Sequence, residues 1–138
     1  MPQLKLIMGV KGSGKTKLFV DMVKDALMDE KGNIVCVERG GRMVYDLPHA
    51  VRLIESSEYG FDGYDFLKGF ISGLRSGNYD ITHIFIDSVL KIIGKELDDD
   101  AADFFDWCDA FGETHGVRFT LMVSADASQA SDRCKKYF

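Results

Sequence analysis

Four residues near the start of the chain have types and a spacing that suit phosphate binding. Gly9, Gly14, Lys15 and Thr16 satisfy the pattern G-x-x-x-x-G-K-[ST] within the stretch GVKGSGKT. Glycines permit backbone angles closed to other residues, so such a loop can turn its N–H groups inward around an anion. The lysine would reach the outer phosphates of a nucleotide, and the threonine hydroxyl would be a ligand for Mg²⁺. The predicted nucleotide-binding residues are Lys11, Gly12, Ser13, Gly14, Lys15, Thr16 and Lys17, and Lys15 is also a catalytic candidate.

The elements around this loop are those that the chemistry requires. The apolar run LKLIM, residues 4–8, predicts a strand directly before the loop. After the loop, apolar residues recur at helical spacing over residues 18–27. A helix that begins near Gly14 would direct the positive end of its dipole at the phosphates. The alternative is a glycine-rich turn with an incidental lysine.

A second candidate metal ligand follows the apolar stretch HIFID, residues 83–87. Asp87 ends this predicted strand, where a carboxylate buried in the core would be costly. At the carboxyl end of a parallel strand it would instead face the crevice where ligands bind, and could hold Mg²⁺ together with Thr16. The alternative is that Asp87 is the N-cap of a helix that begins at Ser88.

The wider pattern predicts a parallel sheet covered by helices. Most of the apolar runs are continuous rather than alternating, which is typical of strands buried on both faces. The expected strands are residues 4–8, 34–37, 51–54, 83–87 and 119–124, and the expected helices lie within 18–27, 67–77 and 97–111. Strands that alternate with helices predict an α/β three-layer sandwich with a mostly parallel five-stranded sheet. We expect one domain over residues 1–138.

Composition narrows the functional classes. With 46% hydrophobic and 28% charged residues, the chain has an ordinary globular balance, and no apolar run is long enough to span a membrane. The N-terminus has no signal-peptide pattern, so we expect a cytoplasmic protein that does not contact the membrane. A net charge of −5 argues against broad nucleic-acid binding.

Two smaller predictions concern cysteines and aspartates. We expect Cys36 and Cys108 to be buried, and Cys134, in a polar tail, to be exposed. Asp98 is a natural N-cap for the third helix. The acidic residues Asp99, Asp103 and Asp106 would then line the solvated face of that helix.

The two motifs GVKGSGKT and HIFIDSV resemble the Walker A and Walker B segments of P-loop NTPases, and the two strands between them resemble the RecA-like branch. In that branch, the strand after the first helix ends in a glutamate that activates water, which implies Glu38 as general base. The alternative is a surface carboxylate paired with Arg39 or Arg42, either of which could also be an arginine finger. Ser124, after the last strand, resembles the polar residue that contacts the γ-phosphate.

The chain is also similar, over nearly its full length, to a group of short bacterial ATP-binding proteins of unknown function, sometimes labelled "twitching motility PilT". The shared segments are KGSGKTK (11–17), GNYDITHIFID (77–87) and a lysine–tyrosine segment at 135–137. Pilus retraction motors are much longer and have a separate N-terminal domain. The sequence continues only briefly after the fifth predicted strand, and we do not expect the DNA-binding loops or the DNA recombination activity of RecA recombinases.

Three functions are consistent with these residues. The first is an ATP-binding protein with slow Mg²⁺-dependent hydrolysis, which acts through an unidentified protein partner or through self-assembly. The second is a nucleotide sensor without hydrolysis. The third, a small-molecule kinase, is the weakest, because no arginine-rich lid segment is found.

Overall fold

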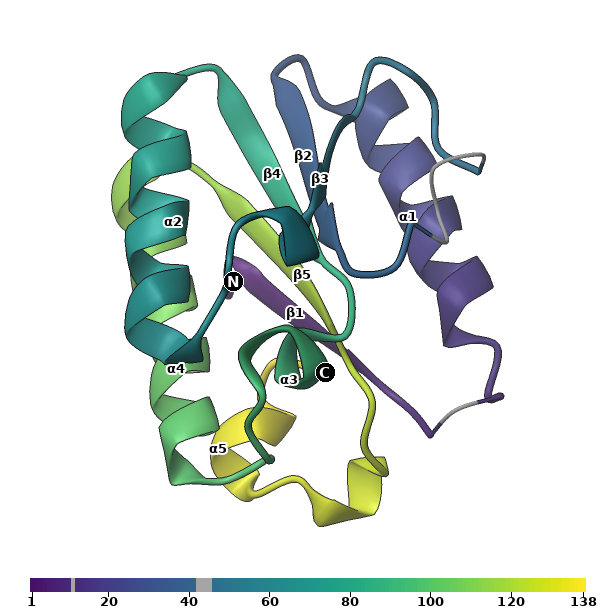
Figure 1. Cartoon of the computed structure of the whole chain (residues 1–138), viewed down its shortest axis with the longest axis vertical. Helices are drawn as coiled ribbons and strands as arrows, with labels where there is room; N and C mark the ends of the chain where they lie inside the picture. Colours follow the sequence, from purple (N-terminus) through teal and green to yellow (C-terminus); the bar gives the residue numbers. More distant parts are fainter. Residues whose placement is uncertain (11, 42–45) are drawn as a thin grey trace.

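A single parallel sheet forms the centre of the molecule (Figure 1). The computed structural model describes residues 1–10, 12–41 and 46–138. The strand order is β1-β5-β4-β2-β3, and every neighbouring pair is parallel. The strands are β1 (Leu4–Met8), β2 (Asn33–Glu38), β3 (Arg52–Glu55), β4 (Ile81–Ile86) and β5 (Arg118–Val123). The five predicted strands and the α/β class are therefore confirmed, with pairing that is parallel throughout.

Among the helices that the structure describes, α1 (Lys15–Asp29) alone covers one face of the sheet (Figure 1). Its buried residues, Phe19, Val20, Val23 and Ala26, recur at the spacing of one helical face. The ring of Phe19 meets that of Phe85 from β4 edge-on, with 5.5 Å between the centroids. This packing fixes the position of α1, and therefore of its first turn, against the sheet.

The other helices cover the opposite face, an arrangement compatible with a three-layer sandwich. They are α2 (Gly63–Gly77), α3 (Val89–Ile93), α4 (Asp99–His115) and α5 (Asp132–Lys135), and two 3₁₀ turns are η1 (Ser56–Glu58) and η2 (Ala127–Gln129). The sequence predicted α2 and α4 but not α3 or α5. A helix of four or five residues is too short to show a hydrophobic repeat. In the described parts of the chain, no helix is long and apolar enough to cross a bilayer.

The start of α4 agrees with its prediction. Asp98 is the N-cap, and its carboxylate accepts a hydrogen bond of 3.0 Å from the backbone N–H of Ala101. Asp99 and Asp100 follow in the first turn, where negative charge complements the helix dipole.

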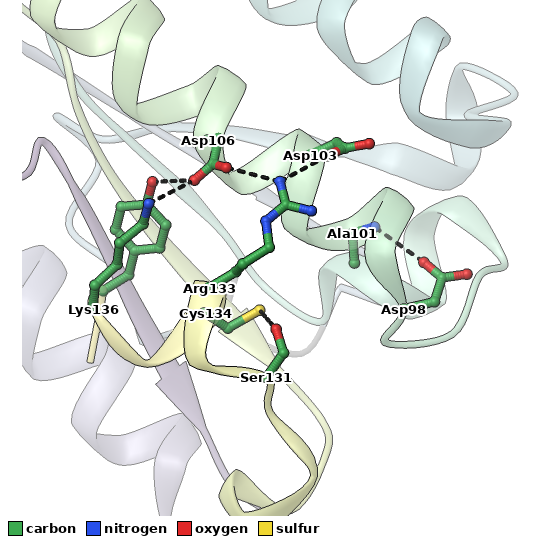
Figure 2. A network of polar contacts seen from close by, with 9 residues as sticks. Asp98, Ala101, Asp103, Asp106, Ser131, Arg133, Cys134 and Lys136 are labelled. Atoms are coloured by element: carbon green, nitrogen blue, oxygen red, sulfur yellow. Dashed lines mark hydrogen bonds and ion pairs between the residues drawn. The ribbon is translucent and has the colours of Figure 1, made fainter.

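The C-terminal segment packs against α4 through a polar network (Figure 2). Arg133 bridges Asp103 and Asp106, at 2.7 and 2.8 Å, and Asp106 also accepts hydrogen bonds from Tyr137 and is paired with Lys136. The two aspartates lie on the solvent-facing side of α4, with side chains 63% and 37% exposed, and from there they also bind the C-terminal segment.

The prediction that Cys134 is exposed is wrong, because the packing of this segment leaves only 2% of the residue accessible. The tail is polar in composition, but the side chains of Cys134 on α5 and of Tyr137 just after it are buried in the core. The backbone N–H of Leu6 in β1 donates to the carbonyl of Tyr137 at 2.8 Å, which attaches the tail to the sheet. Cys36 and Cys108 are buried, as predicted.

We expect Asp106→Asn to reduce the acid sensitivity of folding. Partial burial raises the pKa of Asp106, but hydrogen bonds from Tyr137, Arg133 and Lys136 outweigh it and lower the pKa to about 2. An unfolded aspartate titrates near ~3.9, so this stabilisation is complete above that pH and is lost as the pH falls towards 2. The substitution should cost about 1 kcal/mol at pH 7, a discounted value because 37% of the side chain is exposed to screening water.

The measurement is urea unfolding between pH 7 and pH 2.5. Asp132→Asn is the control, because the carboxylate of Asp132 is fully exposed and pairs only loosely, at 3.7 Å, with Lys135. A wild type and an Asp106→Asn variant that lose stability in parallel through this pH range would contradict the assignment.

Candidate functional site

A cleft of about 650 Å³ lies at the carboxyl end of the sheet, within the range of ~300–1,000 Å³ typical of small-ligand sites. One wall comes from the loop after β1 and the start of α1. It consists of Val10, Gly12, Gly14, Lys15 and Thr16. The other wall follows β4 and β5, and it includes Asp87 and Ser124. The structure therefore brings Lys15 and Thr16 of the first motif and Asp87 of the second to one cleft.

The loop has the backbone conformation that its glycines predict. Gly12 and Gly14 have φ angles of 87° and 82°, in the left-handed region that other residues avoid. The backbone N–H of Ser13 donates to the carbonyl of Val10 at 3.2 Å, and this turn closes the loop. A Cβ at Gly9 would meet the hydroxyl of Ser13, whose side chain would have to rotate away.

The electrostatics of this wall favour an anion. Helix α1 begins at Lys15 and has no acidic residue in its first turn, so nothing there offsets the positive end of its dipole. The ammonium group of Lys15 folds back over the loop and donates to the carbonyl of Val10 at 3.4 Å. A phosphate in the cleft would offer this ammonium a stronger, charged acceptor.

Not every predicted loop residue lines the cleft. The side chain of Lys17 is 86% exposed and pairs with Asp21, one helical turn later, at 3.4 Å. Ser13 is exposed and is not part of the cleft wall. Lys11 lies outside the described residues, as does Arg42.

Asp87 lies at the base of the cleft with 1% of its surface exposed. Its backbone N–H donates to Val37 of β2 at 2.8 Å, and its carboxylate accepts a hydrogen bond of 3.0 Å from the hydroxyl of Ser88. Helix α3 begins at Val89 with Ser88 in the N-cap position, so the alternative prediction of Asp87 as N-cap is wrong.

Ser88 has an uncommon backbone conformation. Its φ and ψ of 53° and 52° are left-handed, and it is the only residue other than glycine with positive φ in the described segments. This conformation costs roughly 1–2 kcal/mol for a residue with a Cβ. Such strained residues are concentrated at functional sites. Here the strained residue adjoins the candidate metal ligand and donates a hydrogen bond to it.

Glu38 is buried beside Asp87 but is not part of the cleft wall. It is 1% exposed, which contradicts its interpretation as a surface carboxylate. Val37 pairs with Ile86, so the next residues along the two strands, Glu38 and Asp87, are neighbours. Burial raises the pKa of the Cys36 thiol, and the charges of Glu38 and Asp87 raise it further. The two carboxylates therefore lie near the same buried thiol.

Two polar side chains of the cleft, those of Ser88 and Lys91, were not predicted as site residues. Lys91 lies on α3 and lines the wall beyond Asp87. Arg39, a candidate arginine finger, donates to the backbone carbonyl of Lys91 at 3.3 Å. The sequence signal for Lys91 would have been its place four residues after Asp87, but α3 itself was not detected.

Comparison with known proteins does not identify the chain. No family model matches it, and no curated protein is similar enough to match.

We expect Ser88→Gly to be more stable than Ser88→Ala by about 1 kcal/mol. Both variants lose the hydroxyl that donates to Asp87, but only glycine adopts a left-handed conformation without strain. Urea unfolding of the two variants measures the difference. Two variants of equal stability would contradict the left-handed conformation at position 88.

Proposed function

We propose that the chain is a P-loop nucleotide-binding protein with a RecA-like core, which binds ATP and Mg²⁺ in this cleft and hydrolyses ATP slowly. The observation that carries the proposal is the meeting of Lys15, Thr16 and Asp87 at one cleft beside the N-terminus of α1. Backbone N–H groups, a helix dipole and a lysine together suit a chain of phosphates. We further propose that the output passes through a protein partner or a homo-oligomer.

The polar groups fit Mg²⁺. The ion prefers oxygen ligands, and one or two protein oxygens with phosphates and waters usually complete its coordination. The hydroxyl of Thr16 and the carboxylate of Asp87 line the same cleft. Across the described residues, no three His, Cys, Asp or Glu side chains form a metal cluster, so the nucleotide would supply the remaining ligands. When bound, the ion would neutralise phosphate charge and orient the phosphate chain.

The protein's own groups would do the remaining work. The loop N–H groups and Lys15 would hold the β- and γ-phosphates, and Ser124 would contact the γ-phosphate from the end of β5. Ser88 would keep the carboxylate of Asp87 in one orientation. Glu38 is the candidate base, and it would need to reach an attacking water within hydrogen-bond distance.

The burial of Glu38 supports a second candidate function, a nucleotide sensor without hydrolysis. A carboxylate that is 1% exposed and not part of the cleft wall would have to move, or the cleft would have to change, before it could activate water. A sensor needs only different affinities for ATP and ADP in two conformations.

We expect Mg²⁺-ATP to raise the thermal stability of the wild type but not of Lys15→Ala. A ligand that binds only the folded state stabilises it by ~2.7 kcal/mol at a hundredfold excess over Kd. Thermal unfolding with Mg²⁺-ATP, Mg²⁺-ADP and Mg²⁺-GTP measures this effect and the base preference. Lys24→Ala is the control, because Lys24 is exposed on the same helix and is not part of the cleft wall. No shift with any nucleotide at millimolar concentration would refute the proposal.

We expect Glu38→Gln to bind Mg²⁺-ATP normally and to release phosphate about a hundredfold more slowly than the wild type, since general bases contribute ~10²–10⁴ to rate. Phosphate release at saturating ATP measures turnover, and thermal unfolding checks that binding is kept. Equal release by the two proteins would exclude Glu38 as the base. Binding without release by the wild type would favour the sensor.

A further inference from the structure

Lys91 gives the cleft a second cation, on the wall opposite Lys15. It lies on α3 beyond Asp87 and Ser88, and it lines the cleft with them. Its side chain is exposed, and within residues 1–10, 12–41 and 46–138 it forms no ion pair. The ammonium is therefore available to a ligand, and it adds a second positive charge to the cleft.

Lys91 faces the loop from across the cleft, on the side of Ser124. Because β5 separates β1 from β4, Ser124 follows the strand between the loop and Asp87. Lys91 lines the cleft with Ser124, and the two residues also share an adjoining hollow. Phosphates held by the loop and Lys15 would extend towards these two residues, so the terminal phosphate of a triphosphate would come closest to them.

The backbone that carries Lys91 is held from two sides. Val89, Ile92 and Ile93 of the same short helix are buried in the core. Arg39 directly follows β2, which lies on the other side of β4 from β5, and its guanidinium donates to the carbonyl of Lys91. A fixed backbone lowers the entropy lost when the side chain contacts a ligand.

We propose that Lys91 binds the terminal phosphate and makes the cleft prefer ATP over ADP. This inference rests on the proposed nucleotide site but goes beyond it, because Lys91 belongs to neither GVKGSGKT nor HIFIDSV. A diphosphate held by the loop and Lys15 would end short of Lys91, whereas a triphosphate would gain a charged hydrogen bond from it. Hydrogen bonds between charged groups are stronger than neutral ones. The added affinity would belong to the triphosphate alone, because only its terminal phosphate reaches Lys91.

Isothermal titration calorimetry with Mg²⁺-AMP-PNP, a non-hydrolysable ATP analogue, and with Mg²⁺-ADP tests this proposal. We expect Lys91→Ala to bind the analogue about tenfold more weakly, since a hydrogen bond to a charged group contributes about that factor or more. Its affinity for ADP should stay within about twofold of the wild type, as ADP does not reach Lys91. Lys91→Gln, which keeps most of the side-chain length, should show the same selective loss and replaces the alanine variant if that variant does not fold.

Lys95→Ala is the matched control. Lys95 lies one turn further along the chain, in an adjoining hollow, and is not part of the cleft wall. We expect it to bind both nucleotides as the wild type does. If both Lys91 variants keep the wild-type ratio of the two affinities, the role of Lys91 is refuted while the nucleotide site stands. If the wild type binds neither nucleotide, the site and this inference are both refuted.

Discussion

The parallel pairing of β5 with both β1 and β4 is the constraint on which the candidate site depends. Parallel strands bring the residues that follow them to one edge, so the loop after β1, Ser124 and Asp87 emerge side by side. The intervening strand also sets the width of the cleft, because neighbouring strands lie ~4.8 Å apart. Two strand spacings, roughly 10 Å, separate the loop from the candidate metal ligand, a distance that phosphates and a hydrated cation can fill.

Local sequence was sufficient for the parts of the site that depend on local backbone. Gly12 and Gly14 predicted a loop with positive φ, and the continuous apolar run before Asp87 predicted a buried parallel strand. The residues that escaped prediction depend on tertiary contacts. Lys91 lies on a helix of five residues, which is too short to show a hydrophobic repeat. The left-handed backbone of Ser88 could not be predicted, because serine does not favour that conformation.

The burial of Cys134 also depends on tertiary contacts that the sequence does not show. Its neighbours are polar, so composition favours exposure, but Arg133 and Tyr137 bind acidic residues of α4 that are distant in sequence. Only the three-dimensional arrangement shows that these charges hold a buried turn against the core. For Glu38 too, the strand could be predicted from the sequence, but the burial of its side chain could not.

The tail has a further consequence for how copies of the chain can meet. β1 is an edge strand, and an exposed strand edge invites pairing with another chain. The carbonyl of Tyr137 accepts the hydrogen bond of Leu6 on that outer edge, so the chain's own terminus occupies a position that a foreign strand would need. A foreign strand could therefore pair along β1 only by displacing the tail from Leu6. Since β1 leads into the glycine-rich loop, the tail opposes strand addition next to the candidate site.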